Sequence, residues 1–155
     1  MAQYCFTPKS FQLYQRRIAV LEEEIAILRG KVSEVTTTGG GWHDNAALDS
    51  LQQDILLAEA RLIREAIPFS DVRIVEYPKK VDYICLGSRT RFTRDNVEST
   101  IDIVAYSEED FDKNKVLYTS PLALALIDHR KGDSFLARIV QRTSQFRILE
   151  VFPLK

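Results

Sequence analysis

The sequence predicts an α+β protein, in which an antiparallel coiled-coil hairpin over residues 1–67 precedes a small antiparallel-sheet domain with one short helix over residues 68–155. Three observations support this fold class. Apolar residues recur at helical spacing in two runs, a glycine-rich break separates those runs, and after Pro68 the apolar residues alternate as they do in strands.

The first arm of the hairpin is an unbroken heptad seam, with apolar residues at alternating steps of three and four. Thr7-Pro8 is a favourable helix start, because a threonine hydroxyl caps free amides and proline suits the first helical position. A helix from Pro8 to Thr36 would be roughly 43 Å long. The seam consists of Phe11, Tyr14, Ile18, Leu21, Ile25, Leu28, Val32 and Val35.

The seam stops at residues 36–41, where three threonines and three glycines disfavour a helix. It resumes after Asn45 and runs to Ile67-Pro68, where proline forces the preceding residue out of helical geometry. Two seams of equal period joined by a short break can pack against each other, so we expect residues 39–45 to form the hairpin tip. The second seam consists of Leu48, Leu51, Ile55, Ala58 and Leu62.

The second half of the chain has the alternation of a sheet. Short strands are predicted at residues 72–75, 81–86, 89–94, 100–106 and 116–118, and Asp95-Asn96 supplies turn chemistry. Ser120-Pro121 is a second cap-plus-proline start, for a helix over residues 122–127. Two further strands, at residues 134–141 and 146–152, complete a domain of about 88 residues, large enough for its own core.

Composition excludes several classes of function. A net charge of -1 gives no global attraction to nucleic acid or to an anionic membrane. No apolar run approaches the ~20 residues that cross a bilayer. Cys5 and Cys85 lack a metal-ligand spacing, which is typical of reduced cytosolic thiols. We therefore expect a cytoplasmic protein that makes no membrane contact.

No conventional catalytic set is present in the sequence. His43 and His129, the two histidines, fall in different predicted domains. Gly39-Gly40-Gly41 lacks the Lys-Ser/Thr and the preceding strand of a phosphate-binding loop. His43 and Asp44 alone are too few ligands for a transition metal. We expect no cofactor of the protein's own.

The predicted tip carries an aromatic ring and a carboxylate, Trp42 and Asp44, beside His43 and Asn45. Two interpretations are open. In the first, Asp44 or Asn45 caps the second helix while Trp42 covers the end of the coiled coil. In the second, a thin rod carries these side chains into a narrow cavity of a partner.

Three segments resemble the bacterial GreA/GreB transcript-cleavage factors. Residues 120–133 are similar to the family's Ser-Pro-Leu-Gly-x-Ala-Leu-Ile-Gly-x-x-x-Gly-Asp segment, and Asp44-Asn45-Ala46 falls where the family has Glu-Asn-Ala at its tip. Cys85-Leu86-Gly87-Ser88 resembles the Phe-Gly-Ser that opens a strand in the family's second domain. Together with the hairpin, the likeness covers nearly the whole chain and implies an FKBP-like fold for residues 68–155.

The resemblance implies a partner and a mechanism. Such factors dock their C-terminal domain at the rim of the secondary channel of RNA polymerase, which assigns partner binding to Ser120, Pro121 and Leu122. The hairpin then reaches toward the active centre and the 3′ end of the nascent RNA. There two tip carboxylates help to hold the second Mg²⁺ of the polymerase, which hydrolyses its own RNA. The factor itself is expected to be a monomer and not an enzyme.

The tip departs from the family's Asp-Leu-x-Glu-Asn-Ala. Gly41 replaces the first acid, and Asp44, shorter by a methylene, replaces the second. Asp44 is therefore the single candidate for a contribution to Mg²⁺ binding. Basic residues are also sparse near the tip, since none follows Lys31 until Arg61. We expect a channel-binding member of the family whose stimulation of transcript cleavage is weak or lost.

Two other functions stay open from the sequence. The chain could carry a peptidyl-prolyl isomerase-like domain, because the family's C-terminal domain resembles that fold. It could also be a coiled-coil adaptor that pairs with another helix. Turnover of a proline-containing peptide would favour the first, and a strictly monomeric chain with no partner helix would weaken the second.

Overall fold

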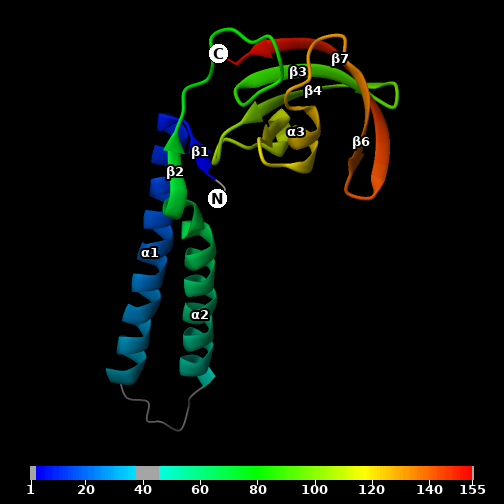
Figure 1. Cartoon of the computed structure of the whole chain (residues 1–155). Helices are drawn as coiled ribbons and strands as arrows, with labels where there is room; N and C mark the ends of the chain where they lie inside the picture. The colour runs from blue at the N-terminus through cyan, green and yellow to red at the C-terminus, as the bar shows by residue number, and fades with distance from the viewer. Residues whose placement is uncertain (1–2, 38–45, 155) are drawn as a thin grey trace. The chain divides into compact units, whose positions relative to one another are not determined.

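The computed structural model describes residues 3–37 and 46–154 (Figure 1). The chain divides into two units: Gln12–Val72 belong to the first, and Gln3–Phe11 with Arg73–Lys155 belong to the second. The boundary that we predicted between residues 67 and 68 stays a prediction. The elements are β1 (Tyr4–Phe6), α1 (Pro8–Thr37), α2 (Ala46–Ala66), η1 (Ile67–Asp71), β2 (Val72–Ile74), β3 (Ser88–Arg94), β4 (Val97–Val104), η2 (Phe111–Lys113), β5 (Lys115–Leu117), α3 (Pro121–Leu126), β6 (Ser134–Ile139) and β7 (Arg142–Pro153).

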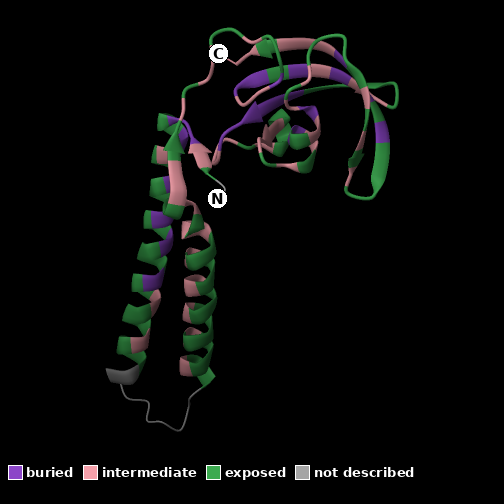
Figure 2. Cartoon of the chain, viewed as in Figure 1, coloured by how far each residue is buried: buried purple, intermediate pink, exposed green. Residues whose placement is uncertain are grey.

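The first unit is the predicted helical hairpin, with α1 and α2 antiparallel and side by side (Figure 1). The seam residues Tyr14, Ile18, Leu21 and Ile25 are buried on α1, whereas no residue of α2 is buried (Figure 2). A narrow seam in a pair of helices covers one stripe on each and leaves the remaining surface in water. Within the described residues, no helix has the length and apolarity that a membrane span requires.

Polar contacts fix the pairing of the two arms. The hydroxyl of Tyr14 donates to the Glu65 carbonyl at 2.6 Å, and Arg17 lies 3.5 Å from the Glu65 carboxylate. Farther along, Arg29 pairs with Glu59. The partner numbers fall on α2 as they rise on α1, which is the signature of an antiparallel pair. Each exposed pair stabilises the hairpin by at most about 1 kcal/mol, so the apolar seam supplies most of the stability.

The second unit contains a five-stranded sheet in the order β5-β4-β3-β7-β6. All neighbours pair antiparallel except β4 and β5, which are parallel. Asp95 and Asn96 join β3 to β4 with φ of 50° and 66°, the left-handed conformation of a two-residue hairpin turn. This confirms the predicted turn. The sheet curls around α3, which lies on its concave face (Figure 1).

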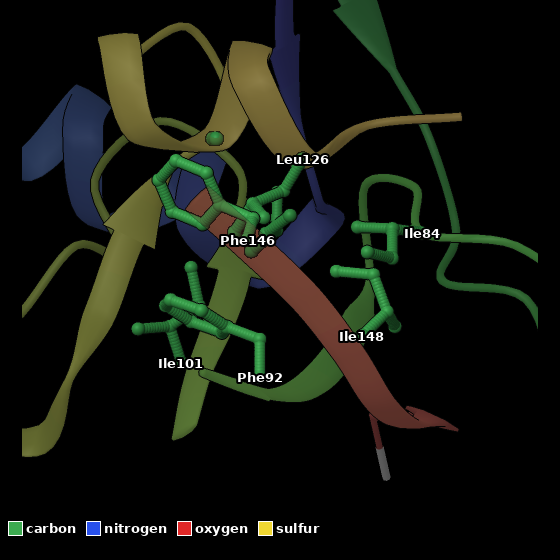
Figure 3. Packing of buried hydrophobic residues seen from close by; sticks show 8 residues of the cluster. Ile84, Phe92, Ile101, Leu126, Phe146 and Ile148 are labelled. Carbon is green, nitrogen blue, oxygen red and sulfur yellow. The ribbon is translucent and has the colours of Figure 1, made fainter. Parts of the chain in front are cut away.

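The core of the second unit lies between this concave face and α3 (Figure 3). Phe92 on β3 and Phe146 on β7 meet with ring centroids 5.9 Å apart, and Leu126 covers them from α3. Side chains from three strands, one helix and one irregular segment therefore share a single apolar interior. The buried members are Ile84, Phe92, Ile101, Ile103, Ala123, Leu126, Phe146 and Ile148.

The strand that we predicted at residues 81–86 is wrong. Ile84 is fully buried, but its segment forms no ladder: its amide donates to the carbonyl of His129, and its carbonyl accepts from the amide of Asp128. The apolar residue that suggested a strand at residues 81–86 is Ile84, which packs into the core from an irregular segment. Strand β1 was not predicted, since three residues carry too little periodicity. The other predicted strands and both long helices are present, with ends that differ by a few residues.

Thr90 interrupts this apolar interior with a hydroxyl. The residue is fully buried on β3, opposite Ile101 on β4 and Val151 on β7. Its Oγ1 has no hydrogen-bond partner among the described residues. A buried hydroxyl without a partner loses its hydrogen bonds to water and forms none in the folded protein, which lowers the stability of the fold.

We predict that Thr90→Val raises the free energy of unfolding by about 1–2 kcal/mol, because valine keeps the shape and removes the uncompensated hydroxyl. Urea unfolding at constant m-value measures this change. Thr93→Val is the matched control: Thr93 lies on the same strand but is half-exposed, so its effect should stay within about 0.5 kcal/mol. A destabilised Thr90→Val would mean that the hydroxyl has a partner after all.

Candidate functional site

The predicted tip residues Trp42, His43, Asp44 and Asn45 lie outside the described residues. Their assignment to a tip, and that of Asp44 to Mg²⁺, therefore stay predictions. The helices that bracket this segment end at Thr37 and begin at Ala46. Within the described part of the chain, no group of three or more His, Cys, Asp or Glu side chains could hold a metal ion.

The predicted partner-binding residues Ser120, Pro121 and Leu122 form the start of α3. Ser120 is the N-cap, and its Oγ accepts from the amide of Ala123 at 3.3 Å. Pro121 occupies the first helical position and is exposed, while Leu122 is half-buried against the core. This confirms the predicted helix start. Leu124, one turn on, leaves 62% of its surface exposed, so the helix presents an apolar edge to solvent.

Tyr118 holds the segment that leads into α3. Its hydroxyl accepts from the amide of Cys5 at 2.8 Å and donates to the carbonyl of Gln3 at 2.9 Å. Its ring meets that of Tyr106 edge-on at 5.6 Å. Burial raises the pKa of Tyr118, which keeps its hydroxyl protonated for this double role. The residues just before Ser120 are thus tied to the N-terminal strand β1.

A second polar cluster fixes the same N-terminal segment. Glu108 accepts from the hydroxyl of Tyr77 and, at 2.6 Å, from that of Thr7. Thr7 also caps α1, since its Oγ1 accepts from the Ser10 amide at 3.1 Å while the Ser10 hydroxyl accepts from the Thr7 amide at 2.9 Å. Burial, together with the hydrogen bond to Glu108, raises the pKa of Tyr77. Sequence reasoning missed this cluster because its members are up to 101 residues apart.

A hollow of about 430 Å³ opens beside α3 on the second unit. Phe92, Ile101 and Leu122 supply its apolar lining, and Arg94 and Asn114 supply polar groups. Arg94 donates to the Ser144 hydroxyl at 3.1 Å and lies 5.6 Å from the centre of the Phe146 ring. One predicted partner-binding residue, Leu122, therefore borders a concave surface that combines apolar and polar groups, as protein-binding sites commonly do.

The segment that follows α3 turns sharply and is held by local bonds. Asp128 has a φ of 73°, and the Asp133 carboxylate accepts from the Arg130 amide at 2.8 Å. The His129 ring stacks on Phe135 at 3.6 Å, and its Nδ1 lies 3.6 Å from the Asp133 carboxylate. His129 therefore packs against Phe135 and lies beside the Asp133 carboxylate, and all three residues belong to the second unit.

The turn at Cys85–Ser88 opens β3. The Ser88 hydroxyl donates to the Cys85 carbonyl at 2.6 Å and accepts from the Cys85 amide at 3.0 Å. Burial, with the nearby charge of Asp128, raises the pKa of the Cys85 thiol, which makes it a poorer nucleophile at neutral pH. Gly87 has a φ of 88°, and an added Cβ would lie 2.7 Å from the Tyr77 ring.

The chain is thus a two-unit protein, a helical hairpin followed by a curled sheet, with a hollow beside the capped start of α3. Residues 79–153 match the family described as "Transcription elongation factor, GreA/GreB, C-term". The GreA elongation factor of Clostridium novyi is 25% identical over 153 residues, which cover 92% of this chain and 96% of that protein. The GreB elongation factor of Neisseria meningitidis is 32% identical over 81 residues, 52% of this chain and 50% of that protein.

This chain is a divergent member of the GreA/GreB family of transcription elongation factors. The resemblance inferred from residues 120–133 is thereby confirmed. A crystal structure of GreA factor homolog 1 (Gfh1) from Thermus thermophilus aligns with 97% of this chain and 99% of its own, at 19% identity and a TM-score of 0.45. The family assignment rests on the sequence matches and not on that structural likeness.

We predict that Gly87→Ala destabilises the protein more than Gly132→Ala. Both glycines have φ near 90°, so alanine at either position costs about 1–2 kcal/mol. A Cβ at Gly132 meets nothing within 4 Å, whereas at Gly87 it would lie 2.7–2.8 Å from the Cβ, Cγ and Cδ1 atoms of Tyr77. The contact should add about 1–3 kcal/mol, measurable by urea unfolding. Equal losses would show that Tyr77 moves aside at no cost.

Proposed function

We propose that this chain is a GreA/GreB-type elongation factor that binds RNA polymerase at its secondary channel through the second unit. In this proposal the hairpin end points toward the polymerase active site, and stimulation of transcript cleavage is weak or lost. The factor is not itself an enzyme but changes the behaviour of the polymerase's own active centre. It acts as a monomer, in the cytoplasm, and approaches the 3′ end of the nascent RNA.

One observation carries the proposal: the family match over residues 79–153 coincides with an ordered surface at Ser120, Pro121 and Leu122. The hydroxyl cap of Ser120 and the ring of Pro121 fix the backbone before any partner arrives. A preformed surface loses little conformational entropy on binding. Pro121 is exposed, and the hollow that Leu122 borders gives the surface a concave part.

The length of the hairpin supports the second part of the proposal. Helix α1 has 30 residues, which at 1.5 Å per residue makes an arm of about 45 Å. Its exposed surface is mixed in charge, with Arg29 paired to Glu59 and Arg17 beside Glu65. A slender arm of this length suits a narrow, solvent-filled passage.

The weak-cleavage part of the proposal rests on the tip sequence. Mg²⁺ is held by hard oxygen ligands, and a two-metal hydrolysis needs both ions in place. Gly41 has no side chain to contribute, so Asp44 is the one acid between Glu34 and Asp49. Losing one of two donated carboxylates should remove most of the assistance to the second ion.

We predict that Pro121→Asp weakens binding to purified RNA polymerase by about tenfold or more, which corresponds to ~1.4 kcal/mol. An aspartate is well tolerated in the first turn of a helix, so α3 should survive the change and only the surface should alter. Leu136→Asp is the control, because Leu136 is 71% exposed on the edge strand β6. Fluorescence anisotropy measures the affinities. Unchanged binding of Pro121→Asp would place the contact elsewhere.

We predict that Gly41→Asp raises cleavage of RNA in backtracked complexes by on the order of tenfold, because it restores a second oxygen ligand. The wild-type chain should stimulate cleavage weakly, and Asp44→Ala should remove what remains. The measurement is the rate of RNA shortening in stalled complexes. A wild-type chain as active as a factor with two tip acids would contradict our interpretation of Gly41.

A further inference from the structure

Phe111 is the most exposed large apolar side chain in the described part of the protein, with 95% of its surface accessible. It opens the 3₁₀ turn η2, between β4 and β5. Isolated exposed apolar residues are common on protein surfaces and mean little alone. Phe111 differs from them because hydrogen bonds hold its backbone and two exposed carboxylates, Glu109 and Asp112, flank it in the sequence.

Several hydrogen bonds between nearby residues hold the turn that carries Phe111. The Asp110 amide donates to the Lys115 carbonyl at 3.0 Å, and the Lys115 amide donates back to the Asp110 carbonyl at 2.8 Å. The Asp110 carboxylate accepts from the Asp112 amide at 3.1 Å. Asn114 closes the turn in the left-handed region, with a φ of 53°, and donates to the Phe111 carbonyl. The ring is thus presented from a fixed backbone, and binding through it would order little more than the side chain.

The charged residues beside Phe111 are mainly acidic, with four acids and two lysines at positions 108–115. Glu109 and Asp112 are exposed, and neither makes an ion pair with another described residue. By contrast, Asp110 lies 3.8 Å from the Lys113 ammonium, and Glu108 is occupied by Tyr77 and Thr7. An apolar ring flanked by two unneutralised carboxylates is complementary to an apolar pocket with a basic rim.

The end of the Phe111 turn and the start of α3 border the same hollow. Asn114, which ends the turn, and Leu122, on α3, both line the hollow of about 430 Å³. A partner that covers Leu122 and extends across this hollow would reach Asn114, three residues after Phe111. Aromatic side chains near the middle of an interface commonly supply much of its binding energy.

We propose that Phe111 anchors a second contact with the partner that binds the α3 surface, by entering an apolar pocket whose rim is basic. This inference rests on the function proposed above, which makes RNA polymerase the partner. It adds the Phe111 turn to the docking surface, with Glu109 and Asp112 steering the approach. The contact covers the Phe111 ring, which the chain alone leaves in water.

We predict that Phe111→Ala weakens binding to purified RNA polymerase by tenfold or more, measured by fluorescence anisotropy on the full chain. Because the ring is almost wholly exposed, the urea midpoint should not change. Val97→Ala is the matched control: Val97 is 66% exposed on β4, and its truncation should change affinity less than twofold. Asp112→Lys should also weaken binding and flatten its salt dependence, whereas Asp82→Lys, at an exposed position outside the turn, should do neither.

Each outcome of this experiment decides the inference. If wild type binds, Pro121→Asp binds weakly and Phe111→Ala binds normally, the Phe111 contact is overturned while the proposed function stands. If Phe111→Ala binds the polymerase weakly and Val97→Ala binds it as wild type does, the Phe111 contact is supported. If Asp112→Lys binds as wild type does, the basic rim is overturned. If wild type shows no affinity for the polymerase, the proposed function and this inference both fall.

Discussion

The hydrogen bonds accepted by the Glu108 carboxylate are the interaction on which the organisation of the second unit depends. It accepts hydrogen bonds from Thr7, which caps the first helix, and from Tyr77, in the segment that follows the hairpin. A partly buried carboxylate is costly unless donors surround it, so these bonds are maintained together. Within the second unit, one acid therefore joins residues 3–11 to the segment after residue 73, although the 61 residues Gln12–Val72 of the first unit separate these two segments in sequence.

The start of α3, which we propose as a binding surface, depends on the same kind of long-range contact. Tyr118 joins the residues before α3 to β1, so the position of Ser120 depends on a strand from the other end of the sequence. The cap of Ser120 then fixes the first turn of α3, and the core beneath Leu126 fixes its inner face. The surface is held by side-chain to backbone hydrogen bonds of Tyr118 and Ser120 and by the buried side chain of Leu126. In the proposed function, this fixed backbone would let the six residues of α3 bind a partner with little loss of conformational entropy.

Local pattern accounts for the parts of the fold that were predicted. The heptad seam needs no tertiary information, since the 3.6-residue period already places Tyr14, Ile18 and Leu21 on one stripe. Asp95-Asn96 marks its hairpin turn by the tolerance of both residues for positive φ. Where the pattern failed, a tertiary contact had replaced it. The sequence pattern predicted Ile84 in a strand, but Ile84 is a core residue of an irregular segment. Its backbone is hydrogen-bonded to Asp128 and His129, which follow α3.

The sequence by itself determined the two long helices, most of the strands, the capped start of α3 and the family. Each of these depends on periodicity, capping residues or short motifs, whose residues are close together in the chain. Only the tertiary structure decided that β1 joins the sheet unit, that Leu122 and Asn114 border one hollow, and that Phe111 stands in water. Those facts depend on contacts between residues far apart in sequence, and hydrophobic burial is not directional. Which apolar side chain finds a partner, and which is left exposed, is settled only when the whole core has packed.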